Sequence, residues 1–290
     1  MGLLDQFKSI ISGGRVDVRA RYEFLRAAIS GTMSQFYKAR DRETGDIVGV
    51  KILDPKKTAE FEARFKGLKK PTEGEILSQI KHPRVVKVLQ HGVTMQGEPF
   101  VVMQFIEGPG LNSLIIGKSE LLDGRRVQLI RQAAEALHAV HESGFIHRDV
   151  CPRNFVVSPE GDDLTLIDFG LTVPATEAFM QPGNRTGTPN YMAPELVKRQ
   201  PTDRRLDIFA FGVSAYEVCT FQLPWERGTT GLVAMKHAEH APVEIQRYRP
   251  QIHPKLAAAI HKAIERNPDN RFATLKEFLS AIETVESEDA

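Results

Sequence analysis

The sequence has few cysteines, almost no net charge and no long apolar run, and each absence excludes a class of protein. Two cysteines in 290 residues do not suggest a disulfide framework, and no Cys/His cluster has the spacing of a metal site. A formal net charge of +1 argues against broad nucleic-acid binding. No apolar run could span a bilayer, and no cationic start followed by an apolar block marks a secretory signal. We therefore expect a protein of the reducing cytoplasm, without a membrane span or a nucleic-acid partner.

The order of the predicted elements favours an α+β chain. Its 41% hydrophobic and 26% charged content is ordinary for a soluble globular protein. Residues 21–53 read as antiparallel strands with a turn at 42–46, and residues 100–105 read as a further strand. Helical patterns dominate later. Helices are predicted over residues 58–68, from Pro71 to Ile80, from 125 onward, and over 207–221, 254–266 and 275–285. Strands first and helices later predict two lobes.

The first residues carry an apolar pattern of their own. Leu3, Leu4, Phe7, Ile10 and Ile11 recur at helical spacing, and glycines follow them. We expect a short helix that packs on the first lobe. The alternative is an anchor to a membrane or a partner, which the scarcity of nearby cations disfavours.

One stretch places charged residues between apolar flanks. Residues 145–157 read FIHRDVCPRNFVV, so Arg148 and Asp149 precede an apolar run, with Asn154 just before that run. Unpaired charges beside buried strands are costly to desolvate, which indicates a functional loop. Asp168 likewise ends an apolar run and is followed by Phe169 and Gly170.

These motifs resemble those of the protein kinase family. The stretch is similar to the catalytic loop H-R-D-L-x-x-x-N, and residues 166–170 are similar to the strand that ends in D-F-G. Further matches follow in the family's order. Val48–Lys51 resembles V-A-I-K, and Glu73 resembles the helix glutamate that pairs with its lysine. Gly187–Glu195 resembles the end of the activation segment, Asp207–Gly212 resembles the central helix, and Arg271 resembles the arginine that pairs with the Glu195 position. The resemblance runs from about Tyr22 to about Ile282 and is strongest to eukaryotic-type serine/threonine kinases of bacteria.

The resemblance implies a β-rich N-lobe with one main helix, a mostly helical C-lobe, and a nucleotide site. Lys51 would contact the α- and β-phosphates of ATP and pair with Glu73, while Met103 would guard the back of the adenine pocket. Adenine would hydrogen-bond the backbone around Gln104 and Ile106, in a hinge near Gln104–Gly108. The nucleotide-contacting set also includes Ile29, Gly31, Ser34, Phe36 and Gly49.

The resemblance also implies the catalytic groups. Asp149 would orient the acceptor hydroxyl and accept its proton. Asn154 and Asp168 would hold Mg²⁺, with Mn²⁺ as an alternative ion. Thr188 would brace Asp149. The implied reaction is transfer of the γ-phosphate of ATP to Ser or Thr of protein substrates.

The phosphate-covering loop departs from the family pattern G-x-G-x-x-G-x-V. Residues 29–36 read ISGTMSQF, so only Gly31 of the glycines is kept. Glycines let backbone amides approach phosphate closely. Ser34 is small enough to allow this approach, but Ile29 should restrict the turn. We expect weaker or slower ATP handling without loss of the site.

The catalytic loop departs at Cys151, where serine/threonine kinases usually carry a lysine. A neutral thiol cannot replace that charge. Arg153 occupies a position where many tyrosine kinases carry an arginine, so it could supply the missing cation. The alternative is a surface arginine. Cys151 is expected to be an inert small residue, the alternative being a thiol activated by local cations.

The segment before Glu195 bears on the acceptor and on regulation. Gly187–Glu195 resembles the docking segment of serine/threonine kinases, although Arg153 keeps dual specificity open. In such kinases, the arginine at the position of Arg148 often binds a phosphate on the activation segment. Thr186 is our first choice for that phosphate because its turn-prone surroundings predict exposure, and Thr176 is the second. The alternative is an unregulated loop.

Two other functions share this pattern. A pseudokinase, acting as a scaffold or binding module, would explain the eroded glycine loop and Cys151. A small-molecule kinase would generally lack the intact Gly187–Glu195 segment. The boundaries that we expect are an N-terminal extension at 1–20, the N-lobe at 21–103, the C-lobe at 104–285 and a solvated acidic tail at 286–290.

Overall fold

The computed structural model describes residues 15–26, 28–31, 33–65, 67–182, 186–228, 235 and 239–290. The helix predicted over residues 3–11 lies outside them. The chain divides into two compact units. The first contains the described residues up to Lys81 together with Val86–Ile106, and the second contains His82–Val85 and Glu107–Ala290.

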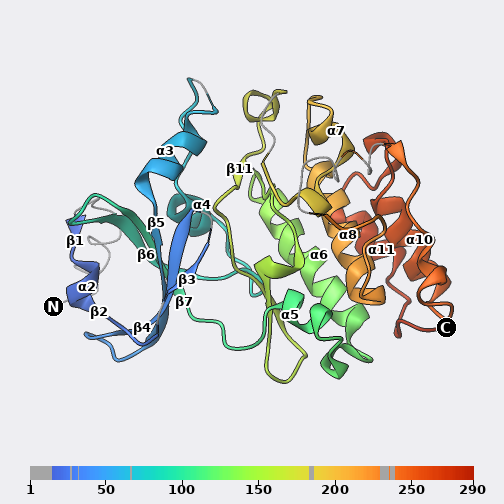
Figure 1. Ribbon diagram of the computed structural model, residues 1–290, viewed down its shortest axis with the longest axis horizontal. Helices are drawn as coiled ribbons and strands as arrows, with labels where there is room; N and C mark the ends of the chain where they lie inside the picture. The colour runs from blue at the N-terminus through green and yellow to red at the C-terminus, as the bar shows by residue number, and fades with distance from the viewer. Residues whose placement is uncertain are drawn as a thin grey trace. The chain divides into compact units, whose positions relative to one another are not determined.

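The first unit is built on a seven-stranded sheet. Its strands among the described residues are β1 (Arg15–Val16), β2 (Tyr22–Phe24), β3 (Ile29–Ser30), β4 (Ser34–Asp41), β5 (Ile47–Leu53), β6 (Val88–Thr94) and β7 (Pro99–Gln104). The order is β1-β6-β7-β5-β4-β2, with β3 on β4. Only the β1–β6 pair of this sheet is parallel. The helices that accompany it among the described residues are labelled in Figure 1: α2 (Val18–Arg21), α3 (Pro55–Glu62) and α4 (Glu73–Gln79).

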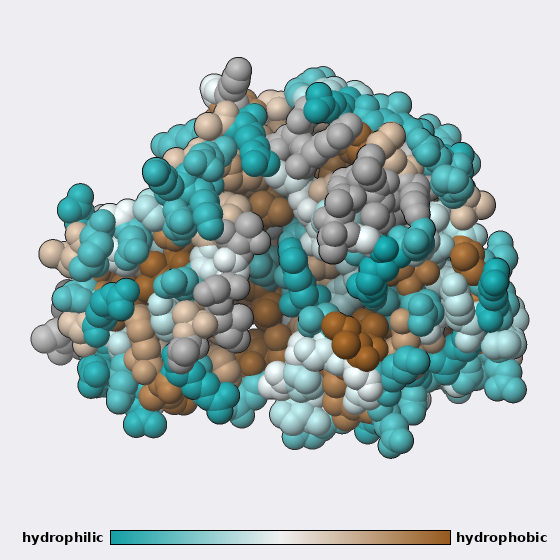
Figure 2. Space-filling model, viewed as in Figure 1, coloured by the Kyte–Doolittle hydropathy of each residue, from teal (hydrophilic) through white to brown (hydrophobic). Residues whose placement is uncertain are grey.

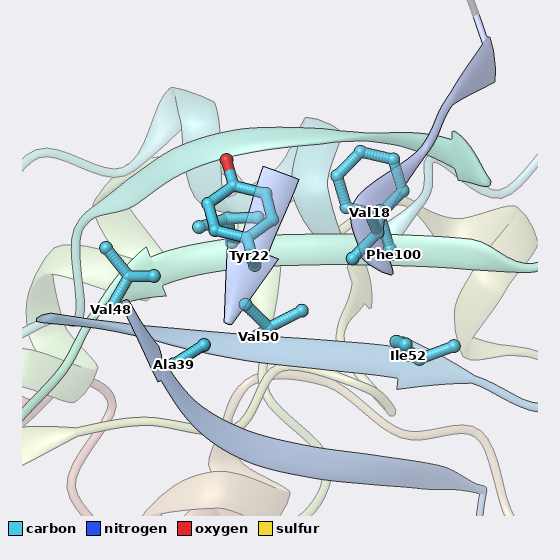
Figure 3. Packing of buried hydrophobic residues seen from close by; sticks show 8 residues of the cluster. Val18, Tyr22, Ala39, Val48, Val50, Ile52 and Phe100 are labelled. Atoms are coloured by element: carbon cyan, nitrogen blue, oxygen red, sulfur yellow. The ribbon is translucent and has the colours of Figure 1, made fainter. Parts of the chain in front are cut away.

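One face of this sheet is a closed apolar layer. Successive strand residues point to opposite faces, so the alternate β5 residues Val48, Val50 and Ile52 share a face. They are buried with Tyr22 and Phe100 in one cluster (Figure 3). Val18 of α2 belongs to the same cluster, so residues just before the predicted N-lobe are part of its core.

The helices of the first unit begin where side chains cap them. Asp54 accepts hydrogen bonds from the backbone N–H groups of Lys56 and Lys57, and Pro55 is compatible with a first helical turn. The predicted start of this helix at residue 58 was therefore wrong, and α3 also ends earlier than predicted. The restart after Pro71 is confirmed, because Thr72 and Glu75 form a reciprocal capping box at the start of α4.

The second unit is mainly helical, as predicted. Its longer helices are α5 (Leu111–Ile116), α6 (Arg126–Glu142), α8 (Arg205–Thr220), α10 (Pro254–Ala263) and α11 (Leu275–Ala281), with a shorter α7 (Pro194–Val197). Short 3-10 turns are η1 (Glu120–Leu122), η2 (Pro152–Asn154), η3 (Glu177–Met180), η4 (Pro189–Tyr191), η5 (Ile245–Arg247) and η6 (Pro268–Asn270). Short strands pair as β8 (Phe145–Ile146) with β11 (Val173–Pro174), and β9 (Phe155–Val157) with β10 (Leu164–Leu166).

The central helix of the second unit is α8, which is buried on nearly all sides. It packs against α6 and α10, and α11 packs against α6. The helix predicted from residue 125 onward is confirmed, and the residues that recur in it at helical spacing are all buried: Val127, Ile130, Ala134, Leu137 and His141. α8 ends where Phe221 takes a left-handed conformation with φ 58°.

Glu286, Ser287 and Ala290 of the acidic tail are exposed, but Glu288 is buried against the second unit, so the prediction of a solvated tail was wrong for that residue. The side chain of Glu288 is 3% exposed and pairs with Arg126 of α6 at 2.9 Å. Asp289 pairs with Arg249 at 2.6 Å, and its backbone bridges to Ile252. Buried carboxylates require such partners, which only the tertiary fold supplies.

The outer surface carries mostly polar side chains. On the face shown in Figure 2, hydrophilic residues cover much of each unit and apolar residues form separate patches. Met95 and Ile116 are the most exposed of the large apolar side chains in the described part of the chain. No helix among the described residues is long and apolar enough to cross a membrane.

Candidate active site

Lys51 and Glu73 form a buried ion pair in the first unit. The ammonium of Lys51 lies 2.7 Å from Oε1 of Glu73, and neither side chain is more than 9% exposed. β5 positions the lysine and the first turn of α4 positions the glutamate. A short ion pair removed from water holds the lysine ammonium at a fixed point.

Gly74 allows α4 to approach the sheet closely enough for this pair. A Cβ on Gly74 would lie 2.3 Å from Cβ of His91 on β6. No side chain fits at that distance, so any other residue would push the helix away from the sheet. Gly74 was not singled out in the sequence, because its role depends on β6, a strand distant along the chain.

Five of the residues predicted to contact nucleotide share one face of the sheet. Phe36 is directly opposite Lys51, and Gly49 is directly opposite Met103. Cross-strand partners lie on the same face, and alternation adds Ser34 to it. The apolar cluster of Val48 and its neighbours occupies the other face.

Gly49 lies against the aromatic ring of Phe36. A Cβ on Gly49 would lie 2.7 Å from the Phe36 ring and 3.3 Å from Cγ of Met103. The glycine therefore leaves the space that the larger side chains of this face occupy.

The turn between β3 and β4 holds the remaining predicted nucleotide residues. Ile29 pairs with Phe36 through the backbone, and the N–H of Gly31 donates to the carbonyl of Ser34 at 2.8 Å. This hydrogen bond closes the tight turn, which keeps one glycine where the family pattern has three.

The predicted hinge lies at the end of β7, where the boundary between the two units follows Ile106. The N–H of Gln104 already donates to the carbonyl of Lys87 at 2.9 Å. Ile106 has no backbone hydrogen bond to any other described residue.

In the second unit, three side chains converge on the carboxylate of Asp149. Thr188 donates to Oδ1 at 2.7 Å, and Arg153 donates to Oδ2 at 2.9 Å. Asn154 donates to the backbone carbonyl of Asp149 at 2.7 Å and to Oδ2 at 3.3 Å. The predicted brace by Thr188 is thus present in the geometry, and Arg153 contacts the loop aspartate instead of lying free on the surface.

Asp207 of α8 holds the loop that carries Asp149. It accepts hydrogen bonds from the N–H groups of His147 and Arg148 at 2.7 and 2.8 Å, and it lies 2.9 Å from Nε2 of His141. Burial opposes its charge, but His141 and the loop amides outweigh burial and hold the pKa of Asp207 below its ordinary value. Arg148 takes a left-handed φ of 67°, a strained conformation that these hydrogen bonds maintain.

The two predicted metal ligands are neighbours through the backbone. The N–H of Ile167 donates to the carbonyl of Asn154 at 2.9 Å, and Asp168 follows directly. Because Nδ2 of Asn154 is the atom that donates to Asp149, Oδ1 is the atom left for a cation. An amide oxygen and a carboxylate suit Mg²⁺, which usually keeps other ligands from water and phosphate. In the described part of the chain, no group of three or more His, Cys, Asp or Glu residues is arranged to hold a metal ion.

Cys151 is buried in this loop, where burial disfavours its thiolate form. It is 1% exposed, and burial together with the charge of Asp149 raises the pKa of its thiol to about 12. Its Sγ lies 3.7 Å from Oγ1 of Thr188.

The candidate regulatory residues differ in exposure. Arg148 is buried and donates to the carbonyl of Phe179 at 3.5 Å. Burial lowers its pKa to about 10, so it stays charged at neutral pH. Thr186 is buried, contrary to the exposure that we predicted, whereas Thr176 is exposed.

The end of the activation segment is anchored to the helices of the second unit. Arg271 makes a bidentate pair with Glu195 at 2.7 and 2.8 Å, as the resemblance implied. Tyr191 donates to Glu217 of α8 at 2.5 Å, and Arg227 pairs with the same carboxylate. Sequence reasoning missed Glu217 and Arg227, since neither lies in a motif.

This arrangement is that of a protein kinase domain, and the family model of that description matches residues 22–281. The chain belongs to the protein kinase domain family, and the predicted two-lobed α+β fold is confirmed. It is 33% identical over 271 residues to a probable serine/threonine-protein kinase of Clostridium perfringens, covering 92% of this chain and 38% of that relative.

Two other relatives give the same result. Serine/threonine-protein kinase pkn3 of Myxococcus xanthus is 30% identical, over 89% of this chain and 48% of the relative. Serine/threonine-protein kinase PknB of Mycolicibacterium smegmatis is 30% identical, over 89% of this chain and 41% of that relative. The chain therefore spans less than half the length of these three relatives.

Proposed function

We propose that this chain is an active protein kinase that transfers the γ-phosphoryl group of ATP to serine or threonine hydroxyls of proteins. The observation that carries the proposal is the carboxylate of Asp149, held by Thr188, Arg153 and the Asn154 amide beside a pocket lined by residues of the Gly187–Ala193 segment. A carboxylate fixed in this way can orient a hydroxyl and accept its proton. The named activity of the three relatives supports the same choice.

The residues of the first unit would bind the nucleotide. Lys51, held by Glu73, would contact the α- and β-phosphates, while Phe36, Gly49 and Met103 would line the adenine side. The backbone groups of Ile106 fit the edge of a base. The turn at Gly31 and Ser34, with Ile29 beside it, would cover the phosphates less closely than a three-glycine loop.

The residues of the second unit would aim the acceptor and hold the metal. Asn154 and Asp168 would bind Mg²⁺, or Mn²⁺ in its place, and the ion would neutralise charge on the phosphates. Arg153 would add the positive charge that Cys151 cannot supply, because it lies against Asp149 with half of its side chain in solvent. Two buried thiols with no disulfide support a cytoplasmic setting.

We propose Thr176 as the site of a regulatory phosphate. It is exposed and directly precedes η3, which contains Phe179, the residue whose carbonyl contacts Arg148. A phosphate there could attract the buried guanidinium. Mass spectrometry of protein incubated with ATP and Mg²⁺, with the activity of Thr176→Ala and Thr186→Ala beside it, tests this. Full activity of both variants without any phosphate on the segment would contradict it.

The proposed activity is tested by incubation with γ-labelled ATP, Mg²⁺ and a generic protein acceptor, followed by phosphoamino-acid analysis. We expect label on serine or threonine, and no transfer by Lys51→Met or Asp168→Asn. Nucleotide binding without transfer would favour the pseudokinase alternative. Transfer only to small-molecule acceptors would favour the other alternative.

A further inference from the structure

The pocket beside Asp149 rests on a buried carboxylate. Tyr191 lines this pocket together with Asp149 and Thr188. Its hydroxyl donates to Oε2 of Glu217, whose side chain is 3% exposed. Burial and the charge of Glu217 raise the pKa of Tyr191, so the phenol stays protonated and remains the donor. The pocket wall and Glu217 are therefore one hydrogen-bonded unit.

Arg227 supplies the charge that compensates Glu217. Its Nη2 donates to Oε1, the carboxylate oxygen that Tyr191 does not use. Burying a carboxylate without a cation costs free energy, and the pairing with Arg227 offsets that cost for Glu217. The side chain of Arg227 is nevertheless 57% exposed. One end of the ion pair is thus buried and the other faces solvent.

The chain around Arg227 is held against the same segment of the pocket. Gly228 donates from its N–H to Oδ1 of Asn190 at 3.1 Å, and Asn190 directly precedes Tyr191. On the other side, Trp225 stacks on Phe209 of α8 with ring centroids 5.8 Å apart. Contacts on both sides hold the chain at Arg227 beside Glu217, the carboxylate that accepts from Tyr191 of the pocket wall.

We propose that Arg227 is a specificity-determining residue that directs the enzyme to acceptor segments with an acidic side chain near the phosphorylated residue. By occupying Glu217, Arg227 closes this carboxylate to a basic side chain of the acceptor. Nη2 is the only guanidinium atom of Arg227 that donates to a described residue, so the other guanidinium donors can bind a carboxylate of the acceptor. This inference rests on the proposed protein kinase activity.

The test compares serine peptides that differ only in having Glu, Ala or Arg at each flanking position. We expect the wild-type enzyme to prefer Glu to Arg at one position by about twofold to fivefold in kcat/KM, the range of an exposed ion pair. Arg227→Ala should uncover Glu217 and shift the ratio toward the Arg peptide. Arg227→Lys should keep the preference for Glu. Arg247→Ala, which removes an exposed arginine from η5, should keep the wild-type ratio.

The outcomes separate this inference from the activity on which it rests. Each ratio is measured within one enzyme preparation, so partial loss of folded protein does not change it. The wild-type enzyme could transfer phosphate with no preference between the Glu and Arg peptides, or with a preference for Arg. Either result overturns the role of Arg227 but not the kinase activity, even where Arg227→Ala is too unstable to assay. An unchanged ratio in Arg227→Ala overturns it as well. No transfer by the wild-type chain to any peptide or protein overturns the proposed activity.

Discussion

Arg153 donates a hydrogen bond from Nη2 to Oδ2 of Asp149 at 2.9 Å, although 54% of the arginine side chain lies in solvent. Residue 151, where related serine/threonine kinases usually carry a lysine, is a buried cysteine with a neutral thiol. The cation nearest to the loop carboxylate in the second unit therefore comes from a different position. The first two predictions concern the two residues of this contact.

Asp149→Asn should reduce phosphoryl transfer by at least ~10²-fold, because an amide cannot accept the acceptor proton. The change keeps the shape of the side chain and the hydrogen bond from Thr188, so folding and nucleotide binding should be nearly unchanged. Steady-state transfer rates and nucleotide titration measure the two effects. Turnover at the wild-type rate would show that Asp149 is not the base.

Arg153→Ala should reduce transfer by at least about tenfold, because it removes the only positive side chain paired with Asp149 in the described residues. Cys151→Lys should restore part of the lost rate in the Arg153→Ala background and have a smaller effect alone. A double-mutant cycle on kcat measures this coupling. Additive effects would show that Arg153 does not replace the missing lysine.

Gly74→Ala should separate Glu73 from Lys51 and reduce transfer by at least about tenfold, because the added methyl group forces α4 away from His91. Transfer rate and KM for ATP are the measurements. Ser78→Ala, on the exposed side of the same helix, is the control and should behave as wild type. Equal rates for both variants would show that the position of α4 does not limit the enzyme.

Both thiols should resist alkylation in the folded protein. Burial raises the pKa of Cys151 and of Cys219 to about 12, so at pH 8 only about one thiol in ten thousand is ionised. Mass spectrometry after iodoacetamide treatment should find neither labelled until denaturant is added. Because the unfolded thiols ionise near pH 8.5, these groups should also reduce the free energy of unfolding as the pH rises above that value. Labelling of native protein at the denatured rate would contradict the burial of both cysteines.

Glu288→Ala should lower the free energy of unfolding by about 3 kcal/mol, because it leaves the buried Arg126 without one of its partners. Urea titration measures the change. Glu286→Ala is the matched control, since it removes an exposed carboxylate from the same tail and should change stability by no more than about 0.5 kcal/mol. Equal stability of the two variants would mean that the tail does not hold the second unit together.

Local patterns were sufficient to locate most elements and most candidate residues. The turn at residues 42–46 between two strand-like runs located β4 and β5. The catalytic loop, Asp168 and Lys51 followed from short motifs that resemble those of the family and whose residues are close together in the sequence. Such motifs can be read directly because the backbone sets the spacing of their side chains. The start of α3 was misjudged because the capping role of Asp54 was not used.

Contacts between distant segments decided the rest. Thr186 follows a polar stretch yet is buried, and Glu288 belongs to an acidic tail yet pairs with Arg126. Gly74 matters because of His91, and Arg227 because of Glu217. Composition along the chain predicts whether a side chain prefers water, but the free energy of a buried charge or a close approach depends on the partner that folding brings to it.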